Sequence, residues 1–137
     1  DIVTCPQANV WGITYDDGPI VSNPANVSDT VDVRNHLDAL GIKATFFIIG
    51  SNAIQHPGII NASLASGHEI GVHTWTHHPM TSLTNQQIVA EIKYTEAQIY
   101  NATGVVPNLF RPPYGDIDDR VRAIIGGSVP FPLGHWK

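Results

Sequence analysis

Two adjacent acids, Asp16 and Asp17, end an apolar stretch and are followed by Gly18-Pro19. An isolated Asp-Asp-Gly-Pro is most often only a turn, because these residue types favour turns. Adjacent side chains on an extended backbone point to opposite faces, so the two carboxylates are expected to have different roles. The other polar clusters of the chain decide between these interpretations.

Two histidines, His73 and His77, are four residues apart in HTWTH. This spacing can present two imidazoles to one ion if the backbone turns once between them. Two His with a carboxylate form a common catalytic zinc set that leaves a position for water. The spacing alone is weak in a chain with seven His, since such residues often lie at the surface. We interpret the neighbouring His78 as a bystander.

The acidic and histidine clusters explain each other. One carboxylate can complete a His-His-Asp metal set, while its neighbour takes a proton from water. Arg111, in RPPYG, could orient the base carboxylate and keep it ionised through charge and hydrogen bonds. A surface salt bridge is the simpler interpretation of this arginine.

The elements that must position these residues alternate between strand-like and helical runs from residue 11 to residue 125, which is typical of a parallel sheet with helical crossovers. We expect strands at 10–17, 42–50 and 68–75, and a fourth leading into 109–116. We expect helices at 27–41, from Pro57 to Gly67, at 82–104 and at 117–125. The polar clusters then follow the carboxyl ends of strands, where functional groups of such sheets collect.

Helical spacing predicts the buried faces and ends of two helices. For the first we expect a cap at Ser28, an end at Gly41 and an apolar face of Val33, Leu37 and Leu40. For the long helix we expect a cap at Thr84, an end at Gly104 and an apolar face of Ile88, Ile92, Ala97 and Ile99.

Composition restricts the classes of function. The 137 residues are 42% hydrophobic and 14% charged, as in one globular domain. A net charge of -5 without a Lys/Arg cluster disfavours a nucleic-acid partner. No apolar run approaches the ~20 residues of a transmembrane helix, and the first residues show no signal peptide.

Three sequons, at Asn26, Asn61 and Asn101, favour a secreted glycoprotein whose signal has been removed. Cys5 is the sole cysteine. It is either a small buried residue, a free thiol or a residue whose partner is absent.

Three ordered motifs, TYDDGP, HTWTH and RPPYG, resemble the first three motifs of the polysaccharide deacetylases of carbohydrate esterase family 4, also called the NodB homology domain. The stretches LDALGIKATFFIIG and GHEIGVHTWTHHPMTSLT look like the fungal chitin deacetylase branch. The resemblance covers roughly residues 10–123.

The resemblance implies a role for each matching residue. Asp16 would be the catalytic base, and Asp17, His73 and His77 would bind a divalent metal, usually zinc, with cobalt as another metal that could serve. Arg111 would orient Asp16.

The RPPYG segment would contact the substrate through Pro113 and Tyr114. The backbone N–H of Tyr114 would also help to stabilise the oxyanion of the tetrahedral intermediate. Pro112 and Pro113 would stiffen this loop.

The implied reaction is hydrolysis of N-acetyl groups on β-1,4-linked N-acetylglucosamine polymers, chitin or chitooligosaccharides, outside the cell or in its wall. A separate acid should protonate the departing amine. In the family this is the His of a Leu-x-His motif, a form found here at Leu133 to His135, although a chance tripeptide in a tail is the simpler interpretation.

The implied fold is a distorted (β/α) barrel of about 200 residues. Residues 1–137 would then be one domain, incomplete at its carboxyl end, with an atypical tail at 124–137. An open barrel side would favour a homo-oligomer, and a disulfide partner of Cys5 would lie in the missing part.

Three alternatives stay open. The chain could be an impaired relative that only binds polysaccharide, or a deacetylase of xylan or peptidoglycan. It could also be an unrelated metal-dependent amidohydrolase on a similar sheet.

Overall fold

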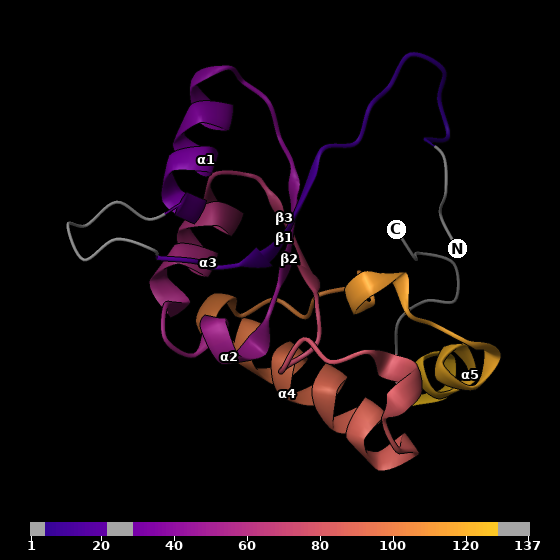
Figure 1. Ribbon diagram of the computed structural model, residues 1–137. Helices are drawn as coiled ribbons and strands as arrows, with labels where there is room; N and C mark the ends of the chain where they lie inside the picture. Colours follow the sequence, from indigo (N-terminus) through magenta and orange to yellow (C-terminus); the bar gives the residue numbers. More distant parts are fainter. Residues whose placement is uncertain (1–4, 22–28, 129–137) are drawn as a thin grey trace.

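The computed structural model describes residues 5–21 and 29–128 (Figure 1). The strands are β1 (Thr14–Gly18), β2 (Thr45–Ile48) and β3 (Glu69–Val72). The helices are α1 (Asp29–Ala39), α2 (Gly50–Ala53), α3 (Pro57–Ala65), α4 (Asn85–Thr103) and α5 (Asp119–Ser128). Short 3₁₀ turns lie at Met80–Ser82 and Pro113–Gly115.

The three strands form a parallel sheet in the order β1-β2-β3. Each crossover contains at least one helix, as parallel neighbours require. All four residues of β2 are buried, which fits a central strand of Thr, Phe and Ile. The predicted α/β class with a parallel sheet is therefore confirmed.

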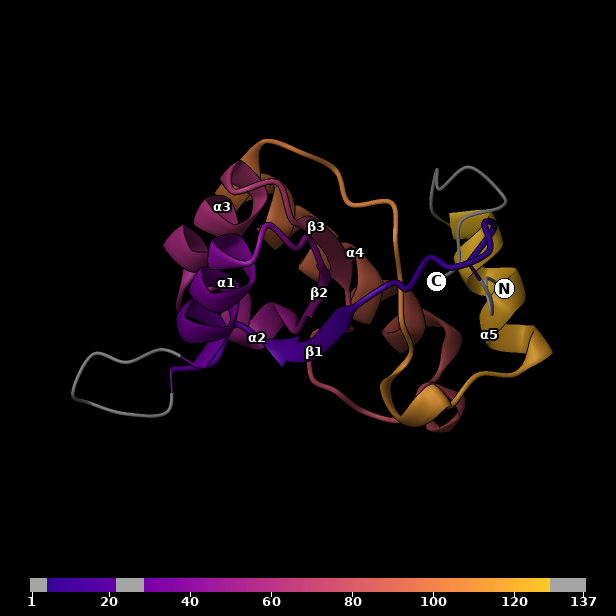
Figure 2. The same ribbon diagram turned by 90° about the horizontal axis from the view of Figure 1, so that it is seen from above.

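A helical layer covers one face of this sheet. Helices α1 and α3 lie side by side, and α4 runs next to β3 (Figures 1 and 2). Between the helices and the sheet lies the main apolar core, made of Leu37, Phe46, Ile48, Ala53, Ile60, Ile70, Val72, Met80, Ile88, Ile92, Ile99, Phe110, Val121 and Ile125 among others. Within the described residues, no helix is both long and apolar enough to span a bilayer.

Helix α4 has the predicted ends but a different buried face. Thr84 and Gln87 form a reciprocal capping box, and Gly104 ends the helix with a left-handed φ of 73°. Ala97 is exposed, so its assignment to the apolar face was wrong. Thr95 is buried instead, and its hydroxyl is satisfied because it donates to the Glu91 carbonyl 2.9 Å away.

The expected fourth strand is reduced to one bridge between Val72 and Phe110. The backbone N–H of Arg111 donates to the Val72 carbonyl at 2.9 Å, and that of Val72 donates to the Leu109 carbonyl at 2.7 Å. Prolines at 107 and 112 have no N–H to donate, so the ladder does not extend.

Other predicted boundaries also change. Strand β2 ends at Ile48, and Gly50 begins α2, which the sequence pattern did not predict. Leu40 lies beyond the end of α1 and is exposed, while Leu37 is buried as expected. Helix α5 continues to Ser128, so residues 124–128 of the expected tail are helical. Ser28 lies outside the described residues.

Candidate metal and acid–base site

Polar residues from the end of β1, the loop after β3 and the segment after Phe110 meet in one hollow of about 570 Å³ at the carboxyl edge of the sheet. Backbone hydrogen bonds continue the sheet to this edge, since the N–H of Ile49 donates to the Gly18 carbonyl at 2.9 Å and that of His73 donates to the Ile48 carbonyl at 2.8 Å. The hollow is lined by Asp16, Asp17, His73, His77, Arg111, Pro112, Tyr114 and Gly115.

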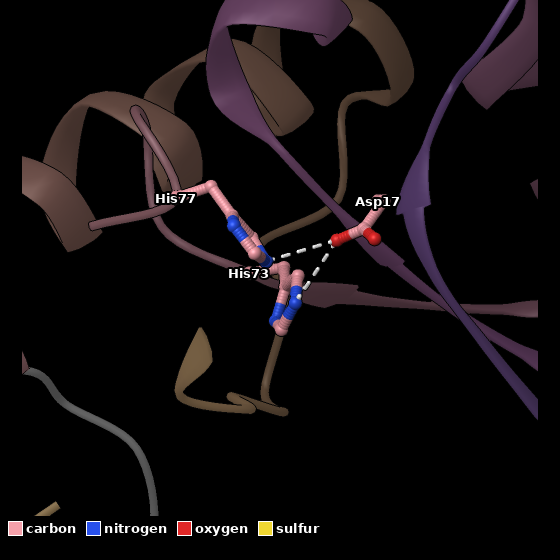
Figure 3. A group of neighbouring side chains, drawn as sticks. All are labelled: Asp17, His73 and His77. Carbon is pink, nitrogen blue, oxygen red and sulfur yellow. Dashed lines mark ion pairs between the residues drawn. The ribbon is translucent and has the colours of Figure 1, made fainter. Parts of the chain in front are cut away.

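Asp17, His73 and His77 point toward one another and could together hold a metal ion (Figure 3). The Oδ1 atom of Asp17 lies 3.3 Å from Nε2 of His73 and 3.1 Å from Nε2 of His77. Tetrahedral zinc with ligands at about 2.0–2.1 Å brings neighbouring ligand atoms to roughly 3.3 Å from one another. Both distances from Asp17 Oδ1 therefore suit such an ion, and the three ligand atoms all lie within 4.8 Å of one another.

Hydrogen bonding also favours a cation at this point. The Nδ1 atom of His73 lies 2.7 Å from the Arg111 carbonyl, which can only accept, so Nδ1 carries the proton. In the neutral ring, Nε2 then presents a lone pair to Asp17. Oδ1 of Asp17 is buried and has no hydrogen-bond donor among the described residues. A cation between these atoms would satisfy both.

His73 is 3% exposed. Burial lowers the pKa of His73 below its ordinary value, while the hydrogen bond to the Arg111 carbonyl and the carboxylates of Asp16 and Asp17 oppose this shift. A lowered pKa favours the neutral imidazole, which is the form that binds metals.

Regular strand geometry predicted that Asp16 and Asp17 point to opposite faces, and this prediction was wrong. Asp17 has a left-handed φ of 70°, and the register of β1 with β2 is irregular between Tyr15 and Gly18. Both carboxylates consequently line the same hollow, with Oδ2 of Asp16 at 4.0 Å from Nε2 of His73. The Asn52 side chain, from α2, donates to the Asp17 carbonyl at 2.9 Å and holds this irregular backbone.

Asp16 is held by Arg111. The Nη1 atom of Arg111 donates to Oδ1 of Asp16 at 2.7 Å and to the Thr14 hydroxyl at 2.8 Å. The guanidinium carbon lies 4.2 Å from the centre of the buried Phe47 ring. Arg111 is thus fixed by two polar contacts and one aromatic face.

Tyr114 forms the outer wall of the hollow. It has a left-handed φ of 59°, its ring centroid lies 4.9 Å from that of His77, and it is 74% exposed. Pro112 lines the hollow. Pro113, predicted to contact substrate, is buried and is not among the lining residues.

The remaining candidates lie elsewhere. Asn61 and Asn101 are exposed on α3 and α4, whereas Asn26 and His135 lie outside the described residues. Cys5 is exposed, so its interpretation as a small buried residue was wrong. His78 is exposed and is not part of the metal group.

Sequence reasoning did not identify the supporting residues of the site. Thr14, Phe47 and Asn52 contact Arg111 or Asp17, and Glu91 contacts the loop that carries His73 and His77. Asn52 and Glu91 come from α2 and α4, far from the motifs in sequence. No local spacing could have identified them, because their contacts exist only after the crossovers have folded.

Comparison with known proteins identifies the family. The family described as polysaccharide deacetylase matches residues 4–126. The chain belongs to this family. An unrelated amidohydrolase is therefore excluded.

Among the relatives of this chain is chitin deacetylase 1 of Cryptococcus neoformans var. grubii, 49% identical over 124 residues. That match covers 90% of this chain and 25% of the fungal protein.

Two bacterial structures have similar folds. The family 4 carbohydrate esterase from Streptomyces lividans, solved with acetate, is 35% identical with a TM-score of 0.76. The match covers 85% of this chain and 57% of the esterase chain. The peptidoglycan deacetylase PdaC from Bacillus subtilis is 36% identical with a TM-score of 0.74. The match covers 82% of this chain and 52% of the PdaC chain. The described sheet and helices are thus part of a NodB-type barrel. The chain spans about half of these structures and a quarter of the fungal relative.

Proposed function

We propose that this chain catalyses metal-dependent hydrolysis of N-acetyl groups on β-1,4-linked N-acetylglucosamine polymers. The observation that carries the proposal is the Asp16 carboxylate, held at 2.7 Å by Arg111 beside the group of Asp17, His73 and His77. An acid–base carboxylate next to a metal site is one arrangement that supports amide hydrolysis by water.

Asp17, His73 and His77 would hold the metal, and zinc is the proposed ion. When bound, such an ion supplies a Lewis acid that polarises an acetyl carbonyl and makes water more acidic. Asp16 accepts the proton that water loses as its oxygen bonds to the carbonyl carbon. Arg111 keeps the Asp16 carboxylate oriented toward that water, and Thr14 and Phe47 keep Arg111 in place.

The carbonyl oxygen becomes an oxyanion when water adds. The Tyr114 backbone N–H is the proposed donor to this oxygen. The C–N bond then breaks, acetate leaves, and the sugar nitrogen takes a proton. His135 stays the predicted source of that proton.

The proposed substrate is chitin or a chitooligosaccharide, because the 49% identical relative is named a chitin deacetylase. Peptidoglycan is the second candidate, favoured by the 36% identity to PdaC. The exposed Tyr114 ring beside an open hollow suits a polymer, which must bind across the surface.

Acetate release from chitin oligomers tests the proposal, with zinc present and with peptidoglycan and acetylated xylan as parallel substrates. We expect the wild-type chain to release acetate from chitin oligomers and the Asp16→Asn variant, which lacks the base, to release none. A wild-type chain that binds zinc and chitin oligomers but releases no acetate from any substrate would be an impaired polysaccharide-binding relative instead.

The proposed location is extracellular or in the cell wall. Asn61 and Asn101 are exposed, as glycosylation requires, and both sit in sequons. For protein made in a eukaryotic host, a shift in mass on treatment with an N-glycosidase, reduced in Asn61→Gln and in Asn101→Gln, would support this location.

A further inference from the structure

The loop that joins the two ligand histidines has an unusual backbone. Thr74 and His77 have left-handed φ values of 65° and 61°. Such conformations are unfavourable for residues other than glycine and persist only when the surroundings hold them. They turn the chain so that His77 and His73 approach the same point, with ring centroids 5.1 Å apart.

Helix α2 holds the carbonyl side of this loop. The N–H of Gly50 donates to the Thr74 carbonyl at 2.9 Å, and the N–H of Ser51 donates to the Trp75 carbonyl at 3.1 Å. The Thr74 hydroxyl also accepts from the N–H of His77 at 3.1 Å. These contacts leave the N–H groups of Trp75 and Thr76 to be satisfied from elsewhere.

Glu91, from α4, satisfies both of these groups. Its Oε2 atom accepts from the N–H of Trp75 at 2.6 Å and from the N–H of Thr76 at 2.8 Å. Its Oε1 atom accepts from the Thr76 hydroxyl at 2.5 Å. One carboxylate thus binds two consecutive amides and a side chain, and hydrogen bonds to a charged acceptor are the strong ones.

We propose that Glu91 is a positioning residue for the metal site. It fixes the segment between the two ligands, so that the Nε2 atoms of His73 and His77 stay within reach of one ion. The inference rests on the metal site of the proposed function. Partners that orient metal ligands typically contribute 10–100-fold to metal affinity, which is the effect expected here.

The alternative is that Glu91 only ties α4 to the rest of the fold. In that case its removal would lower stability but leave the folded site unchanged. Zinc affinity of the folded protein and the visible absorption of the cobalt form separate the two roles, because both report ligand geometry rather than stability.

The test uses Zn²⁺ alone, titrated by calorimetry into the metal-free chain, with a thermal melt of each variant. We expect Glu91→Ala to weaken zinc binding 10–100-fold and to change the cobalt absorption band. Glu91→Gln retains one oxygen that both amides can share, so its affinity should lie closer to the wild type. The matched control is Glu96→Ala, because Glu96 is on the same helix and contacts Lys93. We expect wild-type affinity from it.

Thr76→Val is the second variant, since Thr76 is exposed and its hydroxyl contacts Glu91 directly. We expect weaker zinc binding, with Thr76→Ser restoring it. Wild-type affinity in a folded Glu91→Ala chain would overturn the inference. If Glu91→Ala does not fold, wild-type affinity in Thr76→Val would overturn it. A wild-type chain that binds no zinc would instead overturn the proposed metal site itself, and the inference with it.

Discussion

The Nη1 atom of Arg111 lies 2.7 Å from Oδ1 of Asp16, although 95 positions separate the two residues in the chain. The contact joins the end of β1 to the segment that bridges to β3 at Phe110. The same Nη1 atom also donates to Thr14, and the guanidinium packs on Phe47. The orientation of the Asp16 carboxylate therefore depends on Arg111, and through it on Thr14 and Phe47.

Replacing Arg111 by Lys tests this dependence. Lys retains the charge but has neither the planar fork nor the flat face that lies over Phe47. We expect kcat for acetate release to fall about 10²-fold, since small displacements of a catalytic group have effects of this size. Steady-state kinetics measures it. Arg122→Lys, an exposed change on α5, is the control, and equal kinetics in both variants would contradict the role of Arg111.

A second pair of variants tests the proposed metal ligands. His77→Ala removes an imidazole whose Nε2 lies 3.1 Å from Asp17 Oδ1, whereas His36→Ala removes an exposed imidazole on α1 outside the metal group. We expect His77→Ala to abolish zinc retention after dialysis and His36→Ala to retain it, as measured by atomic absorption. Zinc retained by His77→Ala would show that the metal has other ligands.

The sheet and the metal group could be predicted because their signals are local. The four buried residues of β2 form a short apolar run, and His73 follows β3 directly. Parallel strands bring their carboxyl ends to one edge, so Asp17 and His73 were expected to meet there, and the bridge between Val72 and Phe110 brings Arg111 to the same edge.

Other features depend on contacts that a sequence pattern does not contain. Regular alternation separates Asp16 from Asp17, and only the left-handed φ of Asp17, held by Asn52, brings them together. Thr95 can replace Ala97 in the buried face of α4 because its hydroxyl bonds to the Glu91 carbonyl. Asn52 contacts Asp17 in β1 and Glu91 contacts the loop after β3, and short-range spacing cannot specify either contact.

Gly50 tests how tightly α2 packs against Trp75 and α4. A Cβ at this position would overlap the Trp75 ring and lie 2.6 Å from Thr95 Oγ1. We expect Gly50→Ala to lower the free energy of unfolding by about 1–3 kcal/mol, the usual effect of overpacking. Gly58→Ala in α3 is the control, because a Cβ there would meet no atom within 4 Å. Urea denaturation measures both, and equal stabilities would contradict the packing argument.

Self-association through the open side of the sheet stays a prediction. Among the described residues, the outer edge of β1 pairs with no strand, and Tyr15 on this strand is partly exposed. We expect the 137-residue chain to form a dimer or larger assembly in light scattering. A monomer at all concentrations tested would contradict this expectation.

His68 gives the fold a pH dependence separate from the site. The side chain is fully buried, its Nδ1 atom accepts from the N–H of Ala44 at 3.1 Å, and its Nε2 atom lies 3.3 Å from Oδ1 of Asp38. Burial lowers the pKa of His68 below its ordinary value of 6.5, while the Asp38 carboxylate opposes the shift and Lys43 and Arg34 add to it. Protonation at Nδ1 would also break the bond from Ala44.

Stability should therefore fall in mild acid. Because the pKa of His68 is lower in the folded state than in the unfolded state, the unfolded state binds more protons between these two values. The contribution of neutral His68 to the free energy of unfolding is present in full above pH 6.5 and is lost as the pH falls through the folded pKa.

His68→Asn keeps an acceptor for the Ala44 N–H but has no proton to gain. Urea denaturation across mildly acidic and neutral pH should show a smaller pH dependence in His68→Asn than in the wild type. His36→Asn, an exposed change on α1, should retain the wild-type dependence, and an unchanged slope in His68→Asn would contradict the assignment.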